Sequence, residues 1–133
     1  MDRIFIPTVN RVDQQITFNG LPDELKKRVT MVGQSWERSK YKYDCDYLVL
    51  PEEINLGDRL CLAKTRATIY RVARNQKYAI LDDDLIFKRR NSKRFNAISN
   101  MDKTSRDATP DDVREMFALF TEWLDEPSVT VCG

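Results

Sequence analysis

Three consecutive aspartates, Asp82 to Asp84, are the residues of this chain with the clearest capacity for chemistry. They lie in the stretch KYAILDDDLIFKRR, residues 77–90, between the apolar runs YAIL and LIF. Adjacent carboxylates repel one another and are costly to hold beside an apolar strand unless a positive charge compensates them. A divalent cation can do so, because Mg²⁺ and Mn²⁺ prefer oxygen ligands and are often held by one or two carboxylates together with substrate phosphates. If a strand continues through the triplet, Asp82 and Asp84 share one face and Asp83 points the other way.

The alternative is that the aspartates cap a helix or form an Asx turn, as is common after a strand. The second apolar run, residues 85–87, favours a site, because it indicates that the chain stays in the interior and holds the carboxylates in place. The basic segment KRRNSKR, residues 88–94, follows at once. It is either a solvated loop or an anion site for a diphosphate or a nucleic-acid backbone.

Composition excludes several kinds of site. The chain has 133 residues, a formal net charge of +1 and no histidine, so histidine-based acid–base and zinc chemistry are ruled out. Cys45, Cys61 and Cys132 lack metal-type spacing and indicate a reducing compartment rather than a disulfide framework. No signal-peptide core and no membrane-length apolar run is present, so we expect a cytoplasmic protein with no membrane partner.

Apolar, β-branched runs alternate with helical patterns along the chain. The expected strands are residues 3–9, 28–33, 46–51, 77–83 and 128–133. The expected helices are 21–28, 58–74 and 109–126, whereas 96–108 is polar and irregular. This order predicts one α/β domain over residues 1–133, with three layers and a mostly parallel, Rossmann-like sheet.

The two longer helices carry specific signals. In 58–74 an apolar face is expected at helical spacing, with arginines and lysines on the other face. Its members are Leu60, Ala63, Ala67 and Tyr70, with Leu62, Ile69 and Ala73 beside them. Residues 109–126 begin with Thr109 at the N-cap position and continue with a wide apolar stripe. In parallel sheets, ligands bind beyond the carboxyl ends of the strands, which is where 7–10, 33–35 and 82–84 fall.

The segment LAKTRATIYRVARNQKYAILDDDLIF resembles the donor-binding half of nucleotide-sugar-dependent glycosyltransferases of the GT-A fold, in which a helix bearing an arginine leads into a strand ending in Asp-x-Asp. The opening IFIPTVNRVDQQITFNGLP is similar to the first strand and loop of that family. The likeness is closest to phage-type members that act on modified DNA bases, which share a Thr-x-x-Arg loop with a downstream glutamine, here Thr8, Arg11 and Gln15. The resemblance covers most of residues 3–126.

The resemblance implies a set of site residues. It places Pro7, Thr8 and Asn10 beside the nucleotide, Arg11 near the diphosphate, and Arg66 beside the nucleotide-binding loop or the aspartates. It makes Asp82 and Asp83 nucleotide-sugar contacts and makes Asp82 and Asp84 ligands or near neighbours of Mn²⁺ or Mg²⁺. Gln34, with Glu37 further on, stands where many members carry an acidic residue that reads the base. No residue is assigned as the catalytic base.

The resemblance also implies a function and partners. We expect a metal-dependent transferase that uses a nucleoside diphosphate sugar, most simply a uridine diphosphate sugar, with DNA as a candidate acceptor. Family members usually continue further, so the chain is expected to lack the acceptor-binding half. Apart from the resemblance, a sheet edge at residues 128–133 could pair with another chain, which predicts a homo-oligomer. Two rivals stay open: a metal-dependent phosphoryl-transfer enzyme or nuclease that also uses Asp46, Glu52 and Glu53, and a non-catalytic nucleotide- or nucleic-acid-binding module.

Overall fold

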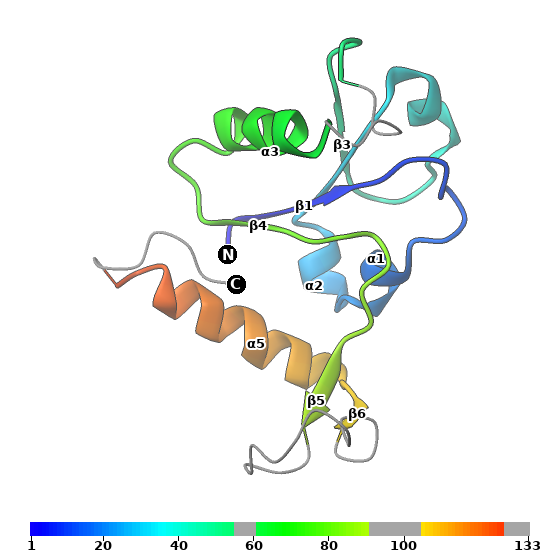
Figure 1. Ribbon diagram of the computed structural model, residues 1–133. Helices are drawn as coiled ribbons and strands as arrows, with labels where there is room; N and C mark the ends of the chain where they lie inside the picture. Colours follow the sequence, from blue (N-terminus) through cyan, green and yellow to red (C-terminus); the bar gives the residue numbers. More distant parts are fainter. Residues whose placement is uncertain (55–60, 91–104, 127–133) are drawn as a thin grey trace.

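The computed structural model of the protein describes residues 1–54, 61–90 and 105–126. Its central sheet has four parallel strands in the order β3-β2-β1-β4 (Figure 1). The strands are β1 (Arg3–Pro7), β2 (Val29–Gly33), β3 (Asp46–Val49) and β4 (Tyr78–Ile80). The α/β class and the parallel sheet predicted from the sequence are therefore confirmed.

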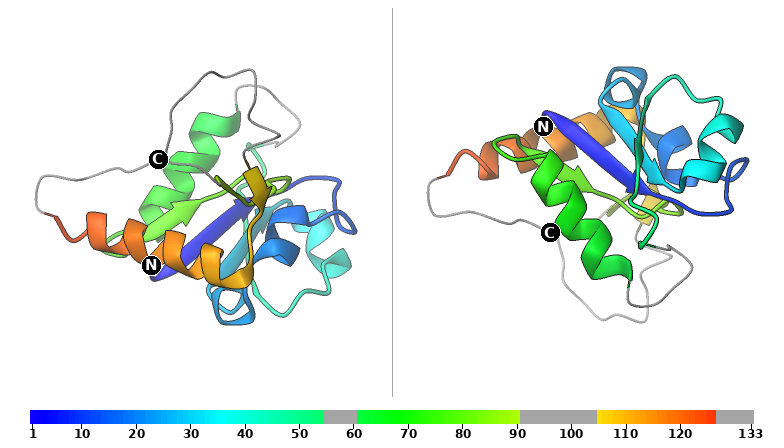
Figure 2. Two further views of the ribbon diagram at one scale, coloured as in Figure 1. Left: turned by 90° about the horizontal axis from the view of Figure 1, so that it is seen from below. Right: turned by 90° about the horizontal axis from the view of Figure 1, so that it is seen from above.

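Helices cover both faces of the sheet, which gives three layers (Figures 1 and 2). One face carries α3 (Cys61–Val72), and the other carries α1 (Ile16–Gly20), α2 (Asp23–Lys26) and α5 (Pro110–Trp123). Alternation along β1 divides the core between the faces, because Phe5 packs on the α3 side while Ile4 and Ile6 pack on the α5 side. All three side chains are fully buried, which identifies β1 as the centre of the domain.

Helix α3 presents a face to the sheet that agrees only in part with the one predicted. Cys61, Thr65 and Ile69 are buried, followed by Ala73 just beyond the helix, whereas Ala63 and Ala67 are exposed. The buried residues recur every four positions, and most of them are small, so the helix lies close to the sheet. The prediction was right for Ile69 and Ala73 and wrong for Tyr70, which is 66 % exposed, as it was for Leu62, Ala63 and Ala67. Leu60 lies outside the described residues.

Helix α5 confirms its sequence signals. Thr109 Oγ1 accepts a hydrogen bond from the Asp112 backbone N–H at 3.3 Å, and the Asp112 carboxylate accepts one from the Thr109 backbone N–H at 2.8 Å. This capping box fixes the start of the helix. Val113 and Phe117 anchor the helix in the core, while Trp123 is 48 % exposed at the outer edge of the apolar stripe.

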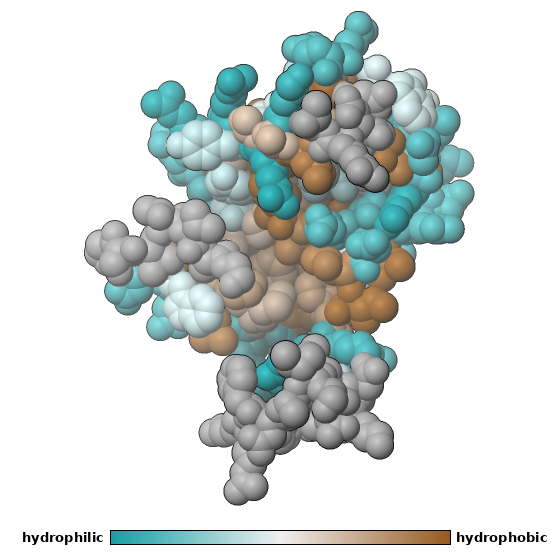
Figure 3. Space-filling model, in the orientation of Figure 1, coloured by the Kyte–Doolittle hydropathy of each residue, from teal (hydrophilic) through white to brown (hydrophobic). Residues whose placement is uncertain are grey.

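An apolar groove of about 600 Å³ runs between α5 and the segment that follows β4. Figure 3 shows hydrophobic side chains gathered in a band across this part of the surface. The exposed members include Ile86, Leu119 and Trp123. Helix α5 therefore buries only part of its apolar stripe against the described residues.

Some elements were missed or misplaced by the sequence patterns. The helix α1 and the 3₁₀ helix η1 (Ser35–Lys40) were not predicted, and β4 ends at Ile80 rather than at residue 83. The basic segment begins with β5 (Lys88–Arg90), which pairs in antiparallel fashion with β6 (Ser105–Asp107) inside the stretch expected to be irregular. The predicted strand 128–133 lies outside the described residues, as does Cys132. None of the described helices is both long and apolar enough to span a bilayer.

Candidate functional site

The loop after β1 and the acidic loop after β4 meet at one edge of the sheet, because their strands are parallel neighbours. Thr8 is 3 % exposed, and its Oγ1 donates a hydrogen bond of 2.8 Å to Asp83 Oδ2. The same oxygen accepts a hydrogen bond of 2.8 Å from Gln15 Nε2 and lies 3.2 Å from the Tyr41 hydroxyl. Thr8 therefore joins the two loops directly.

Thr17 at the start of α1 holds the acidic loop in place. Its backbone N–H donates to the Asp83 carbonyl at 3.1 Å, and its hydroxyl donates to the Asp82 carbonyl at 2.5 Å. The hydroxyl oxygen also accepts from the Leu85 backbone N–H at 2.8 Å. One buried side chain thus satisfies backbone groups on both sides of the aspartates.

Arg11 compensates two of the three aspartates. Its Nη1 lies 3.0 Å from Asp83 Oδ1 and 3.0 Å from Asp84 Oδ2. Hydrogen bonding to Asp84 and the charge of Asp83 raise the pKa of Arg11 above its ordinary value. The side chain of Asp83 is 13 % exposed and that of Asp84 is 51 % exposed, so Asp83 is largely buried and Asp84 faces solvent. The mutual repulsion noted in the sequence is thus offset in part by the protein's own arginine.

The strand alternation that grouped Asp82 with Asp84 does not apply. Because β4 ends at Ile80, residues 82–84 form a turn rather than a strand. Asp83 does not point away from the site, since its carboxylate bonds Thr8 and Arg11. Asp82 and Asp84 are the exposed members of the triplet, and both line the adjoining cleft.

That cleft has a volume of about 330 Å³ and lies between the two loops and α3. Helix α3 contributes Leu62, Thr65 and Arg66. The strands and loops contribute the other lining residues, which are Pro7, Thr8, Val9, Arg11, Ile80 and the three aspartates. In the order β3-β2-β1-β4, the chain leaves β1 towards β2 on one side and returns as β4 on the other. The cleft therefore sits at the topological switch point, where open parallel sheets bind their ligands.

Two predicted site residues face elsewhere. Gln34 is 7 % exposed, and its Nε2 donates to the Ile54 carbonyl at 2.7 Å, away from the residues that line the cleft. Asn10 lies in the left-handed region with φ of 56°, and its backbone N–H donates to Glu37 Oε1 at 2.6 Å. Both belong to the supports of the site rather than to the walls of this cleft. Arg66 is exposed on α3 and does line the cleft.

A second pocket of about 610 Å³ lies on the other side of the β1 loop and shares Arg11 with the cleft. Lys40, Lys42 and Tyr43 contribute to its walls, together with Glu37. Glu37 is 1 % exposed, and its Oε2 has no hydrogen-bond partner within the described part of the chain. Sequence reasoning did not identify Glu37 as a buried group, because a glutamate in the polar run QSWERSK gives no signal of burial.

The tyrosines of residues 41–47 form part of the site's support. The rings of Tyr41 and Tyr47 are 5.4 Å apart, and burial raises the pKa of both phenols. Tyr47 donates to the Gln34 carbonyl at 3.1 Å, and Tyr43 donates to the Val12 carbonyl at 2.8 Å. These contacts show that the tyrosines pack against the residues that support the site.

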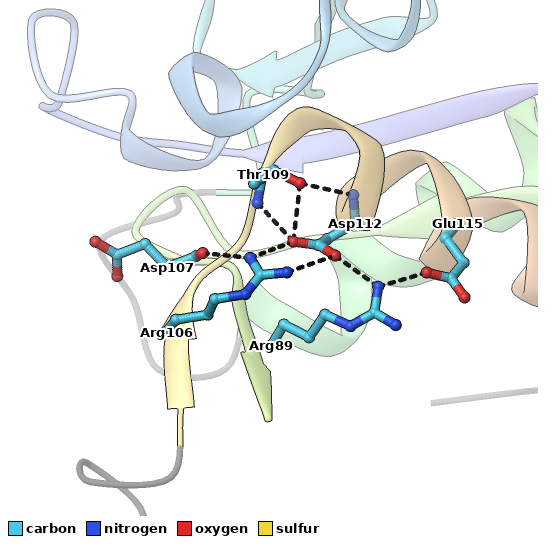
Figure 4. Close-up of polar contacts among 6 residues, drawn as sticks. All are labelled: Arg89, Arg106, Asp107, Thr109, Asp112 and Glu115. Carbon is cyan, nitrogen blue, oxygen red and sulfur yellow. Dashed lines mark hydrogen bonds and ion pairs between the residues drawn. The ribbon is translucent and has the colours of Figure 1, made fainter. Parts of the chain in front are cut away.

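Within the described part of the basic segment, Arg89 contacts the protein's own carboxylates, and Arg106 on the neighbouring strand β6 does the same. Arg89 contacts Asp112 at 2.6 Å and Glu115 at 2.5 Å, and Arg106 contacts Asp112 at 2.5 Å (Figure 4). The hydrogen bond from Arg106 and those from Thr109 and Arg89 hold the pKa of Asp112 well below its usual range. Arg89 therefore anchors the β5–β6 hairpin to the start of α5, while residues 91–94 lie outside the described residues.

The carboxylates required by a nuclease-type site lie far from the acidic loop. Asp46 begins β3 and pairs with Arg3 at 3.9 Å, at the amino end of the sheet. Glu52 and Glu53 follow β3, which is separated from β4 by the strands β2 and β1, or by about 14 Å at ordinary strand spacing. Within residues 1–54, 61–90 and 105–126, no three acidic or cysteine side chains are grouped closely enough to hold a metal ion.

No protein-family model matches the sequence, and searches of curated proteins and of solved structures likewise find no match. The function is therefore inferred from the geometry of the site.

Proposed function

We propose that this protein is the donor-binding part of a metal-dependent glycosyltransferase, which takes a sugar from a nucleoside diphosphate. The observation that carries the proposal is the cleft at the switch point, where three aspartates, Arg11 and Arg66 converge. Carboxylates suit a divalent cation and sugar hydroxyls, whereas guanidinium groups suit phosphate oxygens. A nucleoside diphosphate sugar presents both kinds of group within one molecule.

The acidic loop fits a hard cation by the chemistry of its donors. Asp82 and Asp84 offer exposed carboxylate oxygens on the cleft side. Mg²⁺ or Mn²⁺ bound together with substrate phosphates needs only one or two protein carboxylates, so a cluster of three ligands is not required. Asp83 is already bonded to Thr8 and Arg11, which makes it the fixed member of the loop.

The proposed reaction breaks the bond between the anomeric carbon and the diphosphate oxygen and forms one from that carbon to an acceptor oxygen, which loses its proton. The bound cation would supply charge neutralisation for the departing diphosphate. Arg11 and Arg66 line the same cleft and would stabilise the same developing charge by hydrogen bonding. A base of DNA is the acceptor that the family resemblance suggests, and no side chain is assigned as the base.

The proposal is tested by calorimetric titration of a uridine diphosphate sugar with and without Mn²⁺. Wild type is expected to bind in a Mn²⁺-dependent manner, and Asp84→Asn is expected to bind at least about tenfold more weakly, because one metal ligand is lost. Asp44→Asn is the matched control, since Asp44 is an exposed aspartate before β3, at the opposite end of the sheet. Circular dichroism checks that both variants fold.

Asp84→Asn binding as tightly as wild type in Mn²⁺ would refute the metal role. Hydrolysis of a phosphodiester without any sugar requirement would favour the nuclease alternative. Salt-sensitive DNA binding that ignores both Mn²⁺ and nucleotide would favour the nucleic-acid-binding module.

A further inference from the structure

Thr65 is a buried polar side chain that no contact in the structure explains. It lies on the sheet-facing side of α3, is 1 % exposed and lines the cleft at the switch point. Among the residues that the structure describes, its Oγ1 has no hydrogen-bond partner. Most buried hydroxyl groups are hydrogen-bonded, and leaving one unpaired destabilises the fold.

Two other helical threonines satisfy their hydroxyls locally. Thr68 donates to the Lys64 carbonyl at 2.9 Å, and Thr121 donates to the Phe117 carbonyl at 2.7 Å. Both use the backbone carbonyl four residues earlier, which is the usual local partner of a helical threonine. Thr65 stands on the same helix as Thr68 yet does not make the equivalent bond. Its hydroxyl is thus available to a group outside the helix.

The surroundings of Thr65 indicate what kind of group that is. The cleft has charged walls, at Arg11 and the aspartates, and also apolar ones, at Pro7, Leu62 and Ile80. A ligand that satisfies both carries a charged part and a flat, largely apolar ring with polar atoms on its edge. A nucleobase has this character, and a threonine hydroxyl can both donate to a ring carbonyl and accept from a ring N–H.

We propose that the Thr65 hydroxyl is a ligand contact that hydrogen-bonds the edge of the nucleobase in the donor. This inference rests on the proposed function for the identity of the donor, but the contact itself requires neither the metal nor the diphosphate. Thr65 is therefore assigned to base recognition, and Asp82 and Asp84 to the metal and sugar end of the same cleft.

The Thr65→Val variant separates this role from a purely structural one, because valine keeps the shape and removes only the hydroxyl. The free variant is expected to melt at a higher temperature than wild type, since an unpaired buried hydroxyl is removed. Its affinity for nucleosides is expected to fall by about tenfold, which is the loss of one hydrogen bond. Thr65→Ser keeps the hydroxyl and is expected to bind as wild type does.

NMR titration measures the binding of uridine, cytidine, adenosine and guanosine. The matching nucleoside diphosphates are titrated in the same way, with and without Mn²⁺. Thr68→Val is the control on the same helix and should leave nucleoside affinity unchanged. Asp84→Asn should lose the Mn²⁺-dependent gain for diphosphates but retain nucleoside binding, so failure of the metal proposal and failure of the Thr65 proposal give different results. Thr65→Val binding nucleosides as wild type does, or no nucleoside binding to wild type, would overturn the inference.

Discussion

The contact that most directly ties the fold to the candidate site is the Thr17 hydroxyl, and Thr17→Val is the sharpest test of that contact. The hydroxyl bonds the Asp82 carbonyl at 2.5 Å and the Leu85 backbone N–H at 2.8 Å, so it spans the acidic triplet. Valine preserves the buried shape but offers neither bond. The backbone bond from the Thr17 N–H to the Asp83 carbonyl remains, so the loop is expected to loosen rather than detach.

The expected loss follows from these two bonds. Each lost hydrogen bond to a partly buried backbone group costs about 1 kcal/mol, which gives about 2 kcal/mol for the variant. The cost of each bond is set at about 1 kcal/mol, and not at the larger cost of a fully buried unpaired group, because Asp82 is exposed and Leu85 is only partly buried. Water can therefore replace part of what is lost. For a domain of 133 residues, 1 kcal/mol corresponds to a shift of about 3–4 °C, so the melting temperature should fall by about 7 °C.

Thermal unfolding followed by circular dichroism measures the loss, and amide hydrogen exchange locates it. The Leu85 amide should exchange faster in Thr17→Val, because its acceptor is gone. Thr68→Val removes a hydroxyl of the same kind from an exposed helix position and should change the melting temperature little. Equal melting temperatures for Thr17→Val and wild type, or unchanged exchange of the Leu85 amide, would refute the assignment of Thr17 as the support of the acidic loop.

Two other regions give separate tests. Because hydrogen bonds from Arg106 and from Thr109 hold the pKa of Asp112 below its usual range, Asp112 stabilises the fold above about pH 4 and this stability is lost as the pH falls. Asp112→Asn should therefore be less stable than wild type at neutral pH, and the two should converge in acid; a stability difference that is constant with pH, measured by urea unfolding, would contradict this. Gly33→Ala should be destabilising, because its Cβ would overlap the Tyr47 hydroxyl and lie 3.1 Å from the Thr8 carbonyl oxygen. Denaturant midpoints should show a smaller loss in a Tyr47→Phe background, and an equal loss there would exclude the hydroxyl as the cause.

The sheet and the last helix were predictable because their signals are local. Buried parallel strands read as continuous apolar runs, and the stretches around Phe5, Met31 and Leu48 all show this. The start of helix α5 is predicted by Thr109 at the N-cap and by Pro110 at the first helical position. The buried face of α3 was predictable only in part: Ile69 and Ala73 follow the apolar pattern, whereas Cys61 and Thr65 are buried without belonging to it.

The candidate site was likewise predictable only in part. Parallel strand order implies that residues after β1 and after β4 share an edge, and the contact of Thr8 with Asp83 bears this out. The roles within the triplet were not visible, because they depend on β4 ending at Ile80 and on a turn that directs Asp83 towards Arg11. Thr17 gave no signal, since a threonine in a short helix resembles any other polar residue until its long-range partners are known.

The amino-acid sequence alone determined the α/β class, the parallel strands, the absence of histidine chemistry and the position of the acidic triplet at the end of a strand. These properties follow from residue identity and from spacing along the chain. The pairing of Arg11 with Asp83 and Asp84, the clamp formed by Thr17 and the unpaired hydroxyl of Thr65 arose only when the chain folded. The bonds of Arg11 and Thr17 join residues 65 to 73 positions apart, and the packing of helices on the sheet brings such residues together.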